Sequence, residues 1–358
     1  MVTKGMIEKL HFRKTLAGLP SSFIARTFSL TFSFAVFFSF LFAVLTIGMS
    51  GCHTLSSGPF SGRYDEKFSL QIVPLFNQKS LTQDSTSPKW QGDWIFRRSR
   101  IDLLDRQLIS YKPDVLLFTD LVYRNFDPSE SEVFLLSENS LRDYEWQLSK
   151  VGALKETDES VVAATALSYP NRLHLQQTLS KKYYWNLPGG GYVMKSLFQL
   201  SGRQKSLSFV VKVDAAGDVR RSYEQLSEII DTETKASGLC PGRVLVGGIL
   251  PEDRVGSSHV RFLSKFGLVD SARGFCAELS ECYTEATSNE IRKLQTETGF
   301  ESRHVRLYVH ESAKVFGASR NLEESEAFGI FGGSYGLERY HASDRYGWNV
   351  ELSLRNCN

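Results

Sequence analysis

The chain has 358 residues, with 42 Lys and Arg against 40 Asp and Glu, and its formal net charge is +2. The first 51 residues hold five basic residues and one acid, a net charge of +4, which leaves about −2 for the rest. A nearly neutral domain has no sequence-independent attraction to a phosphate backbone. The charge therefore argues against non-specific nucleic-acid binding.

The N-terminus predicts export from the cytoplasm. The basic residues end at Arg26, and residues 27–51 are uncharged and rich in Phe and Leu. A basic segment, an apolar segment and small residues before a cleavage point describe an export signal. Small residues directly before Cys52 are typical of a bacterial lipoprotein signal. We therefore expect Cys52 to be lipidated and to become the first mature residue.

Other interpretations of this leader remain open. The apolar run is long enough to span a bilayer, so it also fits an uncleaved membrane anchor, and a buried core helix is a third interpretation. The leader is long for a signal, which makes Met6 an alternative start. Both leading interpretations place the rest of the chain outside the cytoplasm. His53 after Cys52 favours the outer membrane, with the inner membrane as the alternative.

Four cysteines follow Cys52, namely Cys240, Cys276, Cys282 and Cys357. An even number in an oxidising compartment indicates disulfides, and four cysteines allow three pairings, which the sequence leaves open. None of their spacings resembles a zinc site. We expect at least one disulfide, and one hypothesis is that it ties the Cys357 tail to the body of the domain.

Residues 52–66 are rich in Ser and Gly, which is typical of a flexible tether. Residues 67–358 contain no linker rich in Pro and Ser and no internal repeat. The sequence therefore predicts a signal or anchor over residues 1–51, the tether, and one domain over residues 67–358.

Strands and helices alternate along the predicted domain. Apolar residues at helical spacing, such as Ile101, Leu104, Leu108 and Ile109, predict one face of a helix. Continuous apolar runs, such as Val115–Phe118, indicate strands that are buried on both faces. In chain order we expect strands over 69–78, 114–122, 160–167, 207–213, 244–250, 305–309 and 342–352, with an alternating run at 349–354, and helices around 101–109, 223–230 and 291–294. Mixed strands with outer helices predict a layered α/β sandwich.

Six short segments carry a family resemblance. They are Asn77 at the end of the first strand, Pro113–Asp120, Ala166–Pro170, Val211–Asp214 with Arg221 and Gln225-Leu226 after it, Gly247–Leu250, and Ser343-Asp344-Arg345. In order and spacing they resemble the motifs of the endonuclease/exonuclease/phosphatase superfamily of metal-dependent phosphoesterases, over about residues 67–354. The resemblance implies a four-layer α/β sandwich, in which two packed mixed β-sheets are flanked by helices.

The resemblance also implies a divalent cation that neutralises charge on the phosphorus oxygens. A hard cation such as Mg²⁺ requires oxygen ligands. Asn77 and Asp344 are retained, and Asp120 carries a carboxylate where the family has the longer Glu. These three residues are therefore candidate ligands of a weakly bound Mg²⁺.

Four other positions depart from the family pattern. Gly248 replaces the Asp that activates or orients water, and Leu250 replaces the Asn that holds phosphate. Arg345 replaces the His at the scissile phosphate, and Asp214 stands where another His is expected. Asp214 and Asp344 remain as candidate catalytic residues. Losing several positioned groups removes large factors in rate, so we expect lost catalysis rather than altered specificity.

The retained residues also have purely structural interpretations. Asn77 fits the end of a strand, Asp120 fits a turn, and Asp344 fits an ion pair with a neighbouring arginine. Asp214 lies in a sequence that favours a hairpin turn. The run Gly189-Gly190-Gly191 lacks the Lys-Ser/Thr of a phosphate-binding loop, and it also predicts a hairpin turn.

The sequence leads to three hypotheses of function. The first is a non-catalytic extracytoplasmic lipoprotein, held at the membrane by its lipid anchor, that needs no metal and binds an envelope protein or a phosphate-containing ligand. The second is a divergent Mg²⁺-dependent phosphodiesterase or nuclease. The third is an envelope scaffold without a ligand. The enzyme requires Asp120 and Asp344 to converge near Asn77, whereas a binding protein requires an open cleft that is short of acids.

Overall fold

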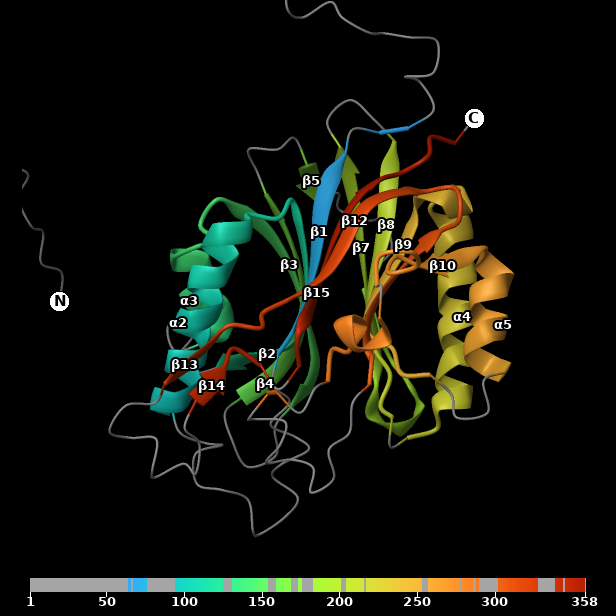
Figure 1. The fold of residues 1–358 in the computed structure, drawn as a ribbon. Coiled ribbons are helices and arrows are strands. Elements are labelled where there is room, and N and C mark those ends of the chain that lie inside the picture. Colours follow the sequence, from blue (N-terminus) through green and yellow to red (C-terminus); the bar gives the residue numbers. More distant parts are fainter. Residues whose placement is uncertain are drawn as a thin grey trace, which may run out of the picture. The chain divides into compact units, whose positions relative to one another are not determined.

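Two mixed β-sheets pack face to face in the described part of the chain, and helices cover their outer faces (Figure 1). The computed structural model describes residues 64–65, 67–75, 94–124, 131–153, 159–168, 173–175, 183–200, 204–215, 217–252, 257–276, 278–285, 288–289, 302–327, 339–343 and 345–357. These residues belong to one compact unit, Gly62–Asn358. Cys52 and the apolar run at 27–51 lie outside the described residues.

The first sheet has the strand order β12-β15-β1-β2-β4-β3. Its strands are β1 (Phe68–Pro74), β2 (Val115–Arg124), β3 (Tyr144–Ala153), β4 (Glu159–Ser168), β12 (Lys314–Asn321) and β15 (Gly347–Ser353). β1 and β2 are parallel, and α2 (Trp94–Tyr111) forms the crossover that a parallel pair requires. The short helix α3 (Glu132–Glu138) follows β2 and packs against it.

The second sheet has the order β10-β11-β9-β8-β7-β5, and β6 pairs with β7. Its strands are β5 (Leu173–Leu175), β6 (Tyr184–Asn186), β7 (Tyr192–Leu200), β8 (Lys205–Lys212), β9 (Val244–Ile249), β10 (Leu268–Asp270) and β11 (Val305–His310). β8 and β9 are parallel and are connected through α4 (Val219–Ala236), and α5 (Ser257–Phe266) follows β9. A two-stranded sheet, β13 (Ser325–Ala327) and β14 (Arg339–His341), lies apart from both.

Alternation along each strand divides the hydrophobic residues between the layers. In β2, Val115 and Leu117 belong to the cluster between the sheets, whereas Leu116 and Phe118 face the layer of α2. The cluster under α4 and α5 is separate from both and contains Leu226, among other residues. Strands that are buried on both faces read as continuous apolar runs. This arrangement confirms the α/β sandwich predicted from the sequence.

The long elements match the sequence pattern better than the short ones. Ile109 is an error in the predicted face of α2, because its side chain is 49% exposed while Ile101 and Leu104 are buried. The helix at Ile291 and Leu294 lies outside the described residues. The elements that were not predicted are α3, α5, β3, β5, β10, β12, β13, β14 and the hairpin partners β6 and β7. The Gly189–Gly191 turn does connect two antiparallel strands, β6 and β7.

A buried ion pair holds the start of the domain to the second sheet. Arg243 precedes β9 and pairs with Asp65, and both side chains are 0% exposed. Arg243 also donates to the carbonyl oxygens of Gln204 (2.6 Å) and Lys205 (3.1 Å). The Asp65 N–H donates to the carbonyl of Leu354 at 2.9 Å, just after β15. The ion pair therefore links the segment before β1 of the first sheet to the turn before β9 of the second sheet.

The four cysteines form two disulfides. Cys240–Cys357 joins the chain end to the loop between α4 and β9, and Cys276–Cys282 closes a short loop after β10. The Cys357 N–H also donates to the Gln204 side chain at 2.6 Å. Among the residues that the structure describes, no helix is long and apolar enough to cross a bilayer.

We expect Asp65→Asn to lower the free energy of unfolding by about 3–5 kcal/mol, because it leaves the Arg243 charge buried without its partner. Urea denaturation of the purified protein measures the change. Glu224→Gln is the matched control, since the pair Arg220–Glu224 is exposed, and it should cost no more than about 0.5 kcal/mol. Equal losses in the two variants would contradict a structural role for the buried pair.

Candidate functional site

Asp120, Lys212, Gly248, Leu250 and Arg345 lie toward one edge of the sandwich, whereas the motif residues Ala166–Ser168 lie beside Val115 at the start of β2, the opposite end. β1 runs parallel to β2 and β8 runs parallel to β9, and their carboxyl ends meet at this edge. The segments before β11 and β15 approach the same edge, because the Leu250 N–H donates to the carbonyl of His304 (2.7 Å) and Arg345 precedes β15. Ligands of α/β sheets commonly bind outside the carboxyl ends of the strands.

Asp120 lies at the centre of this edge with both carboxylate oxygens engaged. Its Oδ2 accepts from the Nζ of Lys212 at 2.7 Å, and its Oδ1 accepts from the hydroxyl of Tyr192 at 3.3 Å. The backbone N–H of Asp120 donates to the same hydroxyl at 3.0 Å. Burial, reinforced by the nearby charge of Asp120, holds the pKa of Tyr192 well above its usual value. Tyr192 therefore stays protonated and donates to the carboxylate.

A local irregularity of β2 aims Asp120 at the second sheet. The pairing of β2 with β4 shifts register between Phe118 and Leu121, and Asp120 has a positive φ of 61°. Such bulges redirect a side chain, and Asp tolerates positive φ better than most residues. Tyr192 begins β7 and Lys212 ends β8, where the two are directly paired. One carboxylate of the first sheet is thereby bound by two strands of the second.

A divalent cation at Asp120 does not fit this arrangement. A metal on the same carboxylate would lie within a few ångströms of the Lys212 ammonium. Two unit charges 4 Å apart interact by about 4 kcal/mol at an effective dielectric constant of about 20, and a dication doubles that repulsion. Within the described ranges, no group of three or more His, Cys, Asp or Glu side chains is arranged to hold a metal. The other candidate ligands, Asn77 and Asp344, lie outside those ranges.

The sequence analysis missed Lys212 and pointed to Asp214 instead. Asp214 lies in the turn between β8 and α4, where its carbonyl accepts from the Gly217 N–H at 3.1 Å. Lys212 is the residue that reaches Asp120. It is a charged residue among Phe209, Val210 and Val211 in a buried strand. A lysine in such a run indicates a buried acidic partner, and this was the available signal.

Gly248 cannot carry the carboxylate that the family motif has at this position. Its φ is 141°, and an added Cβ would lie 2.0 Å from the carbonyl oxygen of Val211 on β8. Leu250, where the family has Asn, is fully buried in the cluster under α4 and α5. Both positions are part of the packed structure, because Gly248 lies against β8 and Leu250 belongs to the cluster under α4 and α5.

Arg345 is bound by an acid that the sequence did not reveal. Its Nε donates to the Oε1 of Glu285 at 2.6 Å, and the Nδ1 of His304 contacts the same oxygen at 3.1 Å. Ser302 donates to the other oxygen at 3.2 Å. Glu285 follows the second disulfide and pairs with Ser302 in an isolated bridge. That segment has no periodic pattern, so nothing in the sequence placed Glu285 here.

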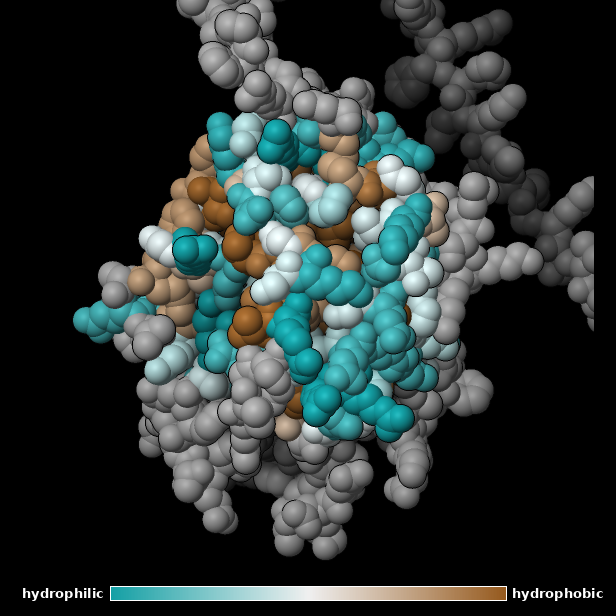
Figure 2. Space-filling view, turned by 90° about the vertical axis from the view of Figure 1, so that its right-hand side faces the viewer, coloured by the Kyte–Doolittle hydropathy of each residue, from teal (hydrophilic) through white to brown (hydrophobic). Residues whose placement is uncertain are grey.

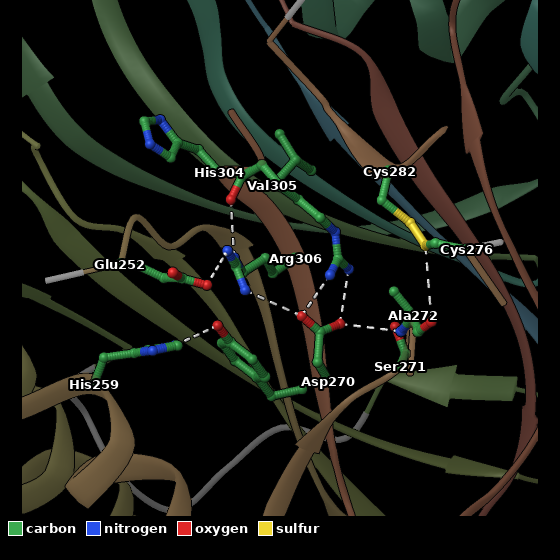
Figure 3. A network of polar contacts seen from close by, with 12 residues as sticks. Glu252, His259, Asp270, Ser271, Ala272, Cys276, Cys282, His304, Val305 and Arg306 are labelled. Carbon is green, nitrogen blue, oxygen red and sulfur yellow. Dashed lines mark hydrogen bonds and ion pairs between the residues drawn. A yellow bond between two sulfur atoms is a disulfide. The ribbon is translucent and has the colours of Figure 1, made fainter. Parts of the chain in front are cut away.

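A second group of paired charges adjoins this one (Figure 3). Arg306 lies between two acids. Its Nη2 donates to the Oε1 of Glu252 at 2.6 Å, and its Nη1 donates to the Oδ2 of Asp270 at 3.2 Å. Arg303 binds both oxygens of Asp270 at 2.7 Å and stacks over the ring of Trp348. Each of the two arginines is therefore neutralised by a neighbouring acid, and the network joins β10 and β11 to β15.

We expect Gly248→Ala to destabilise the protein by at least about 3 kcal/mol, because it combines a strained backbone with a clash on β8. Gly238→Ala is the matched control. Gly238 also has a positive φ, of 62°, but no atom lies within 4 Å of its added Cβ. The control should cost only about 1–2 kcal/mol. If chemical denaturation gave similar losses, the close contact with Val211 would not limit this position.

No family model and no curated protein matches this sequence. Solved structures do match its fold. An endonuclease/exonuclease/phosphatase family protein from Bacteroides thetaiotaomicron aligns with a TM-score of 0.56 at 16% identity, over 80% of this chain and 98% of that one. A mannosyl-6-phosphatase from the same organism gives 0.55 at 16% identity, over 80% and 99%. D. rerio TDP2 complexed with a single-strand DNA product gives 0.53 at 14%, over 80% and 99%. The chain thus has the α/β sandwich fold of endonuclease/exonuclease/phosphatase proteins.

Proposed function

We propose that this protein is an extracytoplasmic lipoprotein whose sandwich domain binds a phosphate-containing ligand without hydrolysing it. One observation carries the proposal: the Asp120 carboxylate is bound by the ammonium of Lys212, which belongs to the chain itself. Metal-dependent phosphoester hydrolysis needs that carboxylate for an exchangeable dication. A fixed lysine neutralises the carboxylate but generates no metal-bound nucleophile.

The exposure of the paired side chains supports binding of an anion. The nitrogen-bearing side chains of these pairs are partly exposed. Their exposed fractions are 11% for Lys212, 16% for Arg345 and 17% for His304. Their acidic partners Asp120 and Glu285 are buried, at 2% and 0%. The edge therefore presents nitrogen donors outward and keeps its carboxylates inside. Donors of this kind suit phosphate oxygens.

The cellular location rests on the sequence of the leader. Small residues before Cys52 favour lipidation, and His53 favours the outer membrane. The lipid anchor would hold the domain at the membrane surface, so the ligand is an extracytoplasmic phosphate compound or the phosphorylated part of an envelope component.

One contact favours the alternative of a divergent Mg²⁺-dependent phosphodiesterase or nuclease. The Nδ1 of His304 lies 3.1 Å from the buried carboxylate of Glu285. A histidine oriented by a carboxylate is the arrangement of many general bases. This pair would supply a base in place of the residues lost at Gly248 and Arg345, with Asp344 contributing to a metal site.

Hydrolysis and binding of bis-p-nitrophenyl phosphate separate the two proposals. We expect the purified protein to bind the ester in equilibrium dialysis, and to release no more nitrophenol with Mg²⁺ or Mn²⁺ than an Asp120→Ala/Asp344→Ala variant releases. Arg345→Gln should weaken the binding, because it removes an outward-facing donor. Cleavage of plasmid DNA by the wild type and by the Asp120→Ala/Asp344→Ala variant is compared in the same way. Metal-dependent turnover that disappears in the double variant would establish the enzyme, and an unchanged affinity of Arg345→Gln would move the ligand away from this edge.

We also expect a divalent metal ion to stabilise the Lys212→Ser variant but not the wild type. Removing the ammonium leaves the Asp120 carboxylate without its cation, so Mn²⁺ should raise the Tm of the variant and leave the Tm of the wild type unchanged. Lys212→Arg is the matched control, because it keeps the positive charge, and its Tm should not respond. Equal stabilisation of the wild type and Lys212→Ser by Mn²⁺ would show that Lys212 does not exclude the metal.

A further inference from the structure

A pocket of about 440 Å³ lies at the opposite end of β9 from the candidate site. It is bounded by the last turns of α4 and α5, by Val244 at the start of β9 and by His310 at the end of β11. Figure 2 looks onto the helix-covered face of the second sheet, where hydrophobic residues appear between hydrophilic ones. The volume corresponds to about 15 water molecules at roughly 30 Å³ each. It lies within the usual range for small-molecule pockets.

We propose that this pocket binds a small, mainly apolar molecule that carries one negative charge. The site is separate from the edge discussed above, and it does not depend on the function proposed for that edge.

The inner wall of the pocket is apolar. Leu239, Pro241, Val244 and Phe266 contribute to its lining, and Val244 is buried within the cluster under α4 and α5. Water makes few favourable contacts with such a wall, so an apolar ligand that displaces this water lowers the free energy. The apolar part of the ligand is assigned to this wall.

The charged residues around the pocket leave one positive charge. Lys235 pairs with Asp231 at 2.7 Å, four residues earlier on α4. Lys265 lies at the end of α5, with its Nζ 5.1 Å from the ring centre of Phe266. Among the lining residues, two ammonium groups and one carboxylate give a net charge of +1, and next to the lining Glu311 and Arg355 carry opposite charges near His310. A ligand with a single anionic group balances this charge.

His310 contributes a neutral donor to the pocket. Its Nδ1 accepts from the backbone N–H of Ser312 at 3.1 Å, so the proton of the neutral ring lies on Nε2. Burial lowers the pKa of His310, which keeps the ring neutral at physiological pH. Its Nε2 faces Gly267, where an added Cβ would lie only 3.0 Å away. Glycine at this position therefore leaves room beside the donor.

The C-termini of the helices at the pocket weaken its attraction for an anion only in part. The C-terminus of a helix carries partial negative charge. At α4, however, the carbonyls of Glu233, Thr234 and Lys235 already accept from the N–H groups of Ser237, Leu239 and Gly238. The ammonium of Lys265 therefore makes the pocket favour an anionic ligand over a cationic one.

Two fluorescent probes test the proposal on the full-length protein. Anilinonaphthalene sulfonate is apolar and anionic, and N-phenylnaphthylamine is its neutral analogue. We expect one equivalent of the anionic probe to bind, and Lys265→Gln to weaken it about tenfold, the size of a lost charge-assisted hydrogen bond. The same variant should change the affinity of the neutral probe less than about twofold. Arg220→Gln, which removes one positive charge at the other end of α4, is the control and should change neither probe.

Leu239→Trp should weaken both probes, because the larger side chain fills the apolar wall. If this variant does not fold, as judged by circular dichroism, His310→Phe replaces it and should weaken the anionic probe by at least about threefold, because it removes the Nε2 donor. Three results would overturn the proposal. They are the absence of saturable binding by the wild type, equal effects of Lys265→Gln and Arg220→Gln, and unchanged affinity in the variant that alters the pocket wall.

Discussion

The ion pair between Asp120 and Lys212 is the constraint on which the candidate site depends. Asp120 belongs to the first sheet and Lys212 to the second, so one contact crosses the sandwich at the edge that holds the candidate site. A buried carboxylate must be balanced, because an unpaired charge in the interior is very costly. In a metal-dependent hydrolase a dication can meet this need and can leave. In this chain the cation is a side chain of β8, so the carboxylate is neutralised permanently.

The same rule organises the other buried acids. Glu233 of α4 pairs with Lys195 of β7, and Asp65 pairs with Arg243 before β9. In each case the partner comes from a different element, and removing one member would leave the other charged and buried. Substitutions at such sites are therefore coupled. The conformation of Gly248 adds a second constraint, since the carbonyl oxygen of Val211 on β8 leaves no room for any side chain at this position.

The sequence predicts the layers well and the site less well, for a physical reason. Apolar runs identify β2 and β9 because both of their faces are buried, and helical spacing identifies α4 through Tyr223, Leu226 and Ile230. Periodicity places a residue on a face but does not identify its partner across the sandwich. The pairing of Lys212 with Asp120 and the approach of Glu285 to Arg345 depend on contacts distant in sequence. The positive φ of Gly248 depends on the neighbouring strand.

The two ends of the second sheet are independent enough to carry separate functions. β9 has six residues, so the pocket at Val244 and the edge at Leu250 are about 20 Å apart at roughly 3.3 Å per residue. That distance exceeds the screening length of about 8–10 Å at physiological ionic strength. Residues at the two ends share no contacts, so the effects of their substitutions on the free energy of unfolding should add. The edge with Asp120 holds a carboxylate that is already neutralised, whereas the lining of the pocket has two ammonium groups and one carboxylate beside an apolar wall. An anionic ligand at the pocket therefore meets a positive charge that the lining residues do not balance, in contrast to the paired charges at the edge.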